Sequence, residues 1–151
     1  MSSSQLVEGF EDHDFQLRGY TVRDYGRSIV LDLIRGGEPE RVTWLEFSGV
    51  ESYRFLHTGG ASITDILEVP FMEAIRETGA DFPEEFRQQG GLAVHFESNE
   101  DYARYFEKEG LHTWLIHSAI GFIGMVVGGC LTSVQAEPSA GGECSSDSDN
   151  P

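Results

Sequence analysis

The sequence predicts an α+β fold in which two or three helices pack against a curved antiparallel β-sheet. Residues in the first half alternate between apolar and polar at the two-residue period of a strand. The middle of the chain changes to the helical period, and the segment after it returns to apolar runs. Strands that precede and follow a group of helices indicate α+β architecture, because an α/β fold would interleave the two kinds of element.

The first two predicted strands form a hairpin. Residues 15–22 alternate in hydropathy and lead into a tight turn at 24–27, where Gly26 can adopt a positive φ. Residues 29–34 follow as a second strand, which we expect to be buried mostly on one face. The sequence GGEP at residues 36–39 then breaks the pattern and indicates a loop.

The strand pattern resumes at residues 42–55, which contain several aromatic side chains. The alternation is interrupted at Ser48 and Gly49, and this interruption predicts a bulge or a corner. After a second break rich in glycine, residues 63–67 are expected to form another short strand.

Helices are predicted in the middle of the chain. Pro70 can occupy the first position of a helix that Gly79 ends, and residues 83–89 can form another turn or two. A strand is expected at residues 92–96.

The strongest helical pattern covers residues 98–109. Ser98 can cap the amino end, and acidic residues in the first turn complement the helix dipole. Lys108 lies in the last turn and Gly110 ends the helix.

The apolar run at residues 114–134 allows two interpretations. Its 21 residues contain one strongly polar side chain, His117, and are long enough to span a bilayer. The cationic anchors that usually flank such a span are almost absent, and four glycines suit strands that bend or approach another backbone closely. We therefore expect buried strands at residues 111–117 and 122–131, with a tail-anchored membrane protein as the alternative.

The net charge of −16 belongs to the predicted domain as well as to its tail. We expect a flexible arm at residues 1–13, one folded domain at 14–135 and a disordered acidic tail at 136–151. The tail has no large apolar residue with which to offset the entropy cost of ordering. It carries four carboxylates and no Lys or Arg, so the rest of the chain keeps a net charge of −12.

This acidity excludes some partners and favours others. Nucleic acid backbones and anionic membrane surfaces would be repelled, because binding to either depends on cationic side chains. A basic protein partner would be attracted, and the same charge also serves solubility. The sequence indicates no particular oligomeric state.

The two cysteines give no disulfide framework, since Cys130 lies in the apolar run and Cys144 in the predicted tail. We expect Cys130 to be an inert thiol. The first ten residues lack the basic and apolar segments of a signal peptide, so a reducing cytoplasm is the predicted compartment.

Three of the five histidines show no site pattern. His13 stands within the acidic sequence EDHD at residues 11–14, but neighbours at a strand entrance alternate faces, so a solvated acidic patch is favoured over a metal site. His57 lies beside two glycines and His95 beside an acidic residue, and neither has a metal-binding motif around it.

His112 and His117 are five residues apart, which places them on opposite faces of a strand. We expect both to be structural residues that form hydrogen bonds. An enzyme with an unrecognised histidine or carboxylate site is a second hypothesis, and it requires a pocket lined by at least two of the five histidines.

Motifs for nucleophilic catalysis, phosphate binding or dinucleotide binding are absent from the sequence. Ser48 and Gly49 lack the rest of a GxSxG motif, and no lysine-containing phosphate loop is present. The glycines at residues 121–129 are not followed by a helix with a polar start. We therefore assign no catalytic, cofactor-binding or metal-binding residue.

Three segments carry a resemblance to known proteins: WLEFSGVESYRF at residues 44–55, ITDI at 63–66 and HSAIGFIG at 117–124. In these strand-and-turn patterns the chain resembles small uncharacterised bacterial proteins over residues 14–134. Some proteins of that kind are immunity proteins, which bind and neutralise a toxin. The resemblance implies a non-enzymatic binding protein whose acidic surface meets a basic partner, and it carries over no site residue.

Overall fold

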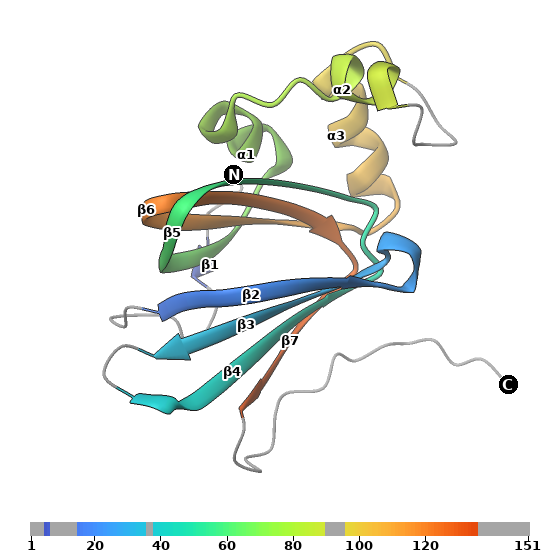
Figure 1. Ribbon diagram of the computed structural model, residues 1–151. Helices are drawn as coiled ribbons and strands as arrows, with labels where there is room; N and C mark the ends of the chain where they lie inside the picture. Colours follow the sequence, from blue (N-terminus) through green and yellow to red (C-terminus); the bar gives the residue numbers. More distant parts are fainter. Residues whose placement is uncertain (1–4, 7–14, 36–37, 90–95, 136–151) are drawn as a thin grey trace, which may run out of the picture.

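The computed structural model describes residues 5–6, 15–35, 38–89 and 96–135. Within these residues, seven strands form one antiparallel sheet in the order β1-β5-β2-β3-β4-β7, with β6 paired to β5. Three helices pack together on one side of the curved sheet (Figure 1). The predicted α+β class is confirmed, with sheet as the larger part.

The first two long strands form the predicted hairpin. β2 (Phe15–Arg23) pairs with β3 (Ser28–Arg35) along its length, with one register shift between Leu17 and Gly19. Ile29, Leu31 and Leu33 lie in one buried cluster, so β3 is buried mostly on one face as predicted, and Val30 is the one buried residue of its other face. A strand in this position can be apolar at consecutive residues.

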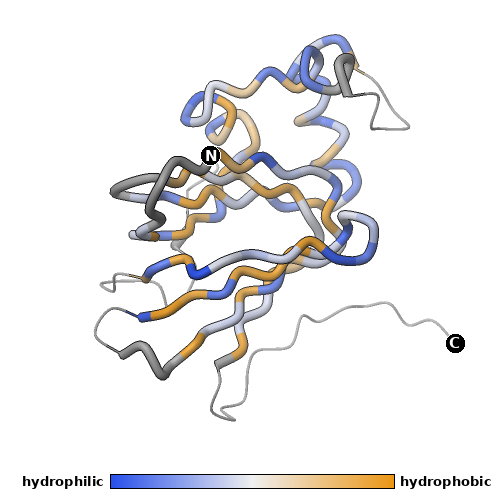
Figure 2. Tube along the Cα trace, viewed as in Figure 1, coloured by the Kyte–Doolittle hydropathy of each residue, from blue (hydrophilic) through white to orange (hydrophobic). Residues whose placement is uncertain are grey.

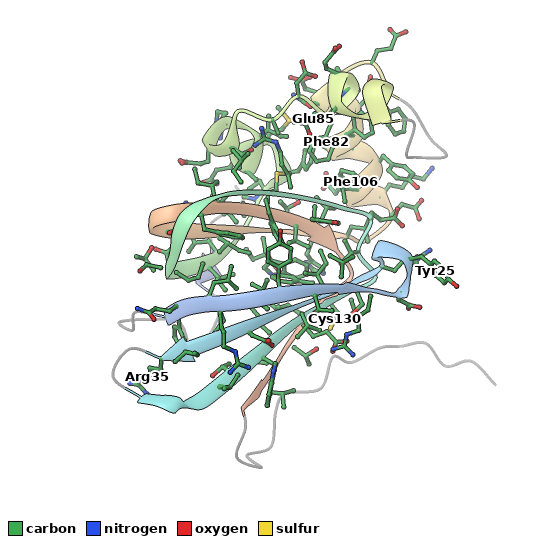
Figure 3. All side chains as sticks on the ribbon, in the orientation of Figure 1. Tyr25, Arg35, Phe82, Glu85, Phe106 and Cys130 are labelled. Carbon is green, nitrogen blue, oxygen red and sulfur yellow. The ribbon has the colours of Figure 1, made fainter. Side chains whose placement is uncertain are left out.

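The turn of the hairpin is the short helical segment η1 (Asp24–Gly26). Gly26 has a positive φ of 90°, as predicted. Asp24 and Tyr25 also have positive φ values, of 59° and 57°, which residues with a Cβ adopt only at some cost in free energy. Tyr25 projects from this turn into solvent, and its side chain is fully exposed (Figure 3).

β4 (Glu38–Ser48) pairs with β3 and begins earlier than predicted. The predicted loop at residues 36–39 is therefore too long, because a proline near the start of a strand can be accommodated. The predicted interruption at Ser48 and Gly49 is the turn into the next strand, and Gly49 has a φ of 62°.

β5 (Ser52–Val69) joins two segments that the sequence divided between separate strands. Its register with β6 shifts at three places, and this irregular pairing lets the strand continue through the glycine-containing segment. Its other edge pairs with β2 and with β1 (Gln5–Leu6), two residues from the predicted arm. The rest of that arm and the predicted tail lie outside the described residues.

The apolar run at residues 114–134 forms strands. β6 (His112–Gly128) pairs with β5, and β7 (Cys130–Gln135) pairs with β4. Among the described residues, no helix is long and apolar enough to cross a membrane. The membrane alternative is therefore not supported, and the two strands separate at Gly129 instead of near residues 118–121.

β6 is apolar on both faces because it lies between two hydrophobic cores. An inner core fills the space between the β5–β6 pair and the layer made by β2, β3, β4 and β7 (Figure 1). Trp114 and Ile116 belong to this inner core, whereas Leu115 and Met125 belong to an outer core under the helices. Since successive strand residues point to opposite faces, such a strand reads as a continuous apolar run.

The glycines that end β6 mark a close backbone contact, as predicted. The Gly129 N–H donates to the Ser48 carbonyl at 3.0 Å, and a Cβ at Gly128 would lie 3.2 Å from the same oxygen. The bend between β6 and β7 therefore packs directly on the β4–β5 turn.

The helical layer consists of α1 (Phe71–Thr78), α2 (Phe82–Gln89) and α3 (Asn99–Lys108). Pro70 is the N-cap residue of α1, one position earlier than predicted, and Gly79 ends the helix with a φ of 68°. Hydrophilic residues dominate the end of this layer that lies farthest from the sheet (Figure 2).

The predicted cap of α3 is confirmed, because the Ser98 Oγ accepts a hydrogen bond from the Asp101 N–H at 3.1 Å. Residues 92–95 of the strand predicted just before it lie outside the described residues. Phe96 is not in a strand and packs instead on Tyr102, with ring centroids 5.1 Å apart.

Candidate binding site

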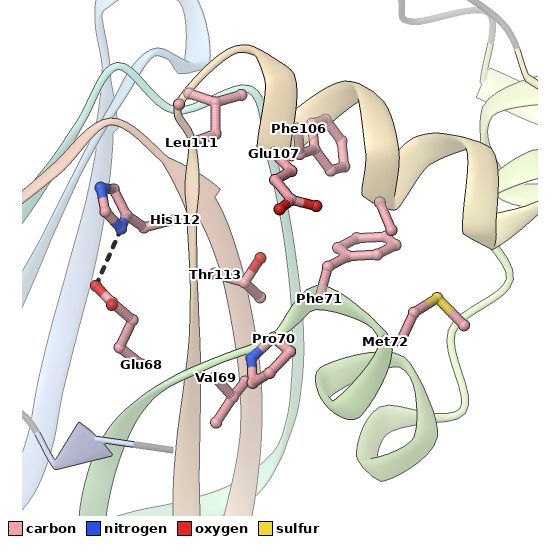
Figure 4. A pocket seen from close by; sticks show the side chains of 12 residues that line it. Glu68, Val69, Pro70, Phe71, Met72, Phe106, Glu107, Leu111, His112 and Thr113 are labelled. Atoms are coloured by element: carbon pink, nitrogen blue, oxygen red, sulfur yellow. Dashed lines mark ion pairs between the residues drawn. The ribbon is translucent and has the colours of Figure 1, made fainter. Parts of the chain in front are cut away.

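A cleft of about 670 Å³ opens between the helical layer and the start of β6 (Figure 4). It forms where β5 leads into α1 and where α3 leads into β6. Its volume lies within the usual range of small-ligand sites in proteins. Its apolar lining includes Val69, Pro70, Phe71, Met72, Phe106 and Leu111, and its polar lining includes Glu68, Glu107, His112 and Thr113.

The floor of the cleft is aromatic and tightly packed. Phe71 begins α1 and Phe106 lies in the last turn of α3, and their ring centroids are 5.2 Å apart in an edge-to-face arrangement. The ring of Phe82 packs edge-to-face on that of Phe71, with the centroids 5.0 Å apart. All three rings are buried in the outer core, so the floor is held in place by the packing of the helices.

Thr113 gives the cleft a buried hydroxyl. Its residue is 5% exposed, and it is the one buried polar residue in the part of the chain that the structure describes. No buried side-chain oxygen or nitrogen in those ranges is left without a hydrogen-bond partner, so this hydroxyl carries no unmet need for a hydrogen bond. In Figure 4 it points to the same side of β6 as the helices, toward the carboxylate of Glu107.

Glu107 supplies an exposed carboxylate at the opposite wall. It lies in the last turn of α3 and forms no ion pair with any described residue. A negative charge at this end of a helix is disfavoured by the helix dipole, so the position favours a nearby cation. The cleft thus combines an apolar floor with the Glu107 carboxylate and the Thr113 hydroxyl, and the side chains of Glu68 and His112 border it.

His112 borders the cleft from the other face of β6. Its Nδ1 lies 3.2 Å from the Glu68 Oε1, and its ring stands 5.8 Å from that of Trp114. Figure 4 shows the His112–Glu68 pair on the side of the strand away from Thr113. This histidine therefore has its own carboxylate partner at the sheet edge.

His117 lies on the helix-facing side of β6 and outside the cleft. Its Nδ1 is 2.7 Å from the Oδ1 of Asp65, its cross-strand partner on β5. The prediction that His112 and His117 point to opposite faces is confirmed. His117 makes the expected hydrogen bond, and His112 lies within ion-pairing distance of Glu68. The structure does not bring them together.

The remaining histidines give no further information about a site. His13 with the acidic sequence at residues 11–14, and His95, lie outside the described residues, as does the side chain of His57. Among the residues that are described, His112 is the single histidine at the cleft, and no group of three potential ligands could hold a metal ion.

Between residues 15 and 135, negative charge is concentrated in the segment that forms the helical layer. Residues 70–110 contain ten Asp or Glu and four Lys or Arg, a net charge of −6. Residues 15–69 contain eight Asp or Glu and six Lys or Arg, a net charge of −2, and residues 111–135 contain none of either kind. The cleft opens beside this acidic layer.

The state of Cys130 differs from the one predicted for it. It was expected to be an inert thiol inside an apolar run, but it is disulfide-bonded and half-buried at the first position of β7. The end of β6 at Gly128 separates it from the buried part of the run. Cys144 lies outside the described residues, and the cytoplasmic localisation stays a prediction.

Little in the amino-acid sequence indicates this cleft. Glu107 is one of 26 acidic residues, and its position opposite Thr113 depends on how α3 returns to the sheet. The one available signal was Thr113 itself, a polar residue directly before an apolar run. Comparisons of the chain with protein-family models, with curated proteins and with solved structures find no match, so the geometry of the molecule alone supports any functional assignment.

Proposed function

We propose that this chain is a non-enzymatic binding protein whose acidic helical face binds a basic protein partner, in the manner of an immunity protein. The segregation of charge carries the proposal. The helical segment at residues 70–110 has a net charge of −6, which is three times that of the larger sheet. A charge spread evenly for solubility alone would not favour the smaller layer.

A one-sided field of this kind has a physical consequence for association. It attracts a basic surface from a distance and orients it toward the helices, which raises the rate of productive encounters. Glu77, Glu97 and Glu109 are exposed at separate places on the helical layer, so the field covers a broad face and not one point.

Salt dependence tests whether charge drives the binding. We expect a basic partner captured from the source cell to dissociate as ionic strength rises from about 0.05 M to 0.5 M, because counterions screen exposed charges. Binding that is insensitive to salt would contradict the proposal.

Two variants with equal changes in net charge test where the partner binds. Glu77→Gln, Glu97→Gln and Glu109→Gln together remove three charges from the helical layer without touching the first turns of the helices. Gln16→Lys, Thr21→Lys and Val134→Lys add the same charge at exposed positions of the sheet. We expect the first variant to lose affinity much more than the second. Equal losses would show that only net charge matters and would overturn the assignment of the helical face.

A further inference from the structure

We infer that the cleft beside Thr113 receives a lysine or arginine side chain of the basic partner. The cationic group would lie at Glu107 and Thr113, and the alkyl stem would lie on the aromatic floor. That this side chain belongs to a protein partner rests on the proposed function. The preference of the cleft for an alkyl cation rests on its own residues and is tested separately.

The carboxylate of Glu107 selects for charge. It has no ion-pair partner among the described residues, and the surrounding segment at residues 70–110 is acidic. An anionic ligand would be repelled, and a neutral ligand would leave the charge of the carboxylate uncompensated. A cation would compensate a negative charge that the last turn of α3 disfavours.

The hydroxyl of Thr113 adds a hydrogen-bonding group at the bottom of the cleft. Thr113 is 5% exposed, and its hydroxyl points into the cleft toward Glu107 (Figure 4). A ligand that covers this oxygen removes it from water, so a ligand group that donates a hydrogen bond to it is favoured over one that only displaces solvent. Ammonium and guanidinium groups donate several hydrogen bonds and accept none.

The floor suits the rest of a Lys or Arg side chain. Phe71 and Phe106 present packed rings, and Leu111 adds an aliphatic wall. Long cationic side chains bury their methylene groups on such surfaces while the charged end stays near polar groups. A cation close to an aromatic ring gains further attraction from it. The volume of about 670 Å³ is large enough for one such side chain together with its immediate neighbours.

Titration of the full-length protein with small probes tests the chemistry of the cleft. In NMR spectra we expect n-butylammonium and n-butylguanidinium to shift the amide signals of Leu111 and Thr113, and n-butanol to shift them far less. Glu107→Gln should weaken binding about tenfold, the loss expected for one charged hydrogen bond. Glu109→Gln, which removes a nearby exposed charge outside the cleft, should leave the affinity within about twofold.

Three results would overturn the inference about the cleft: no shift at these amides, equal binding of n-butanol, or equal effects of the two glutamate variants. Thr113→Val replaces the hydroxyl by a methyl group of the same shape and should weaken n-butylammonium binding severalfold. If that variant does not fold, Glu107→Gln alone decides, because its side chain is exposed.

The same variants test the inference about the cleft and the proposed function independently of each other. If Glu107→Gln weakens both probe and partner binding, both proposals stand. If the partner still binds as tightly while the probe does not, the cleft accepts a free alkyl cation and the assignment to a partner side chain is wrong. If the probe binds but no partner shows the expected salt dependence, the proposed function fails and the chemistry of the cleft remains.

Discussion

The guanidinium of Arg54 on β5 binds the carboxylate of Glu85 on α2 and so links the sheet to the helical layer. Its Nε donates to the Glu85 Oε1 at 2.9 Å, and its Nη1 donates to the Thr78 carbonyl at 3.3 Å. Glu85 belongs to α2, which lies at the top of the helical layer in Figure 3. One guanidinium on β5 therefore satisfies a carbonyl at the carboxyl end of α1 and holds a carboxylate of α2.

This arrangement predicts unequal effects of removing either partner. Glu85→Gln should lower the free energy of unfolding by about 0.5–1 kcal/mol, since both side chains are partly exposed. Arg54→Met should lower it by about 1–2 kcal/mol, because it also leaves the Thr78 carbonyl without this donor. Urea denaturation of the single and double variants measures both losses. Identical losses in the two single variants would show that the bond to the Thr78 carbonyl adds nothing, and full additivity in the double variant would show that the Arg54–Glu85 contact contributes nothing.

The cap at Ser98 predicts a separate loss in α3. Ser98→Ala removes the acceptor of the Asp101 N–H and should lower the free energy of unfolding by about 1 kcal/mol. Ser98→Asp keeps an acceptor at this position and should restore most of the stability. Thermal denaturation followed by circular dichroism measures both variants, and equal melting temperatures for the two would argue against the cap.

Two glycines of the sheet should differ in their tolerance of an added methyl group. A Cβ at Gly124 would lie 2.7 Å from the Phe122 ring and 3.1 Å from the Phe55 ring, so Gly124→Ala should cost about 1–3 kcal/mol through overpacking. A Cβ at Gly19 would meet no atom within 4 Å, and Gly19→Ala should be tolerated. Chemical denaturation compares them. A stable Gly124→Ala protein would mean that the two rings have room to move.

The turn at Tyr25 stores strain that a substitution can release. Because Tyr25 has a φ of 57° and a fully exposed side chain, Tyr25→Gly should raise the free energy of unfolding by about 0.5–1 kcal/mol. Thr21→Gly, an exposed position with ordinary strand geometry in the same hairpin, should lower it by a similar amount. A loss of stability in Tyr25→Gly would mean that the tyrosine ring stabilises the fold in another way.

Local features of the sequence were sufficient for most elements. Ser98, Gly79 and Gly110 mark helix ends through caps and positive φ angles that act within a few residues, and the structure has them where predicted. The hairpin of β2 and β3 was predicted for the same reason, because its turn chemistry is local. The predicted lengths of the strands were less accurate than their positions. β5 continues through a glycine-containing segment because the neighbouring strand β6 supplies pairing that the segment by itself does not favour.

By itself, the sequence determined the α+β class, the helix ends and the excess of negative charge, since each depends on composition or on residues close together in the chain. Only the tertiary structure decided that residues 114–134 form strands, because their apolar character comes from two cores that distant elements build on either face. It also decided the cleft: Glu107 and Thr113 meet across it because α3 turns back to the sheet, and no local pattern encodes that return.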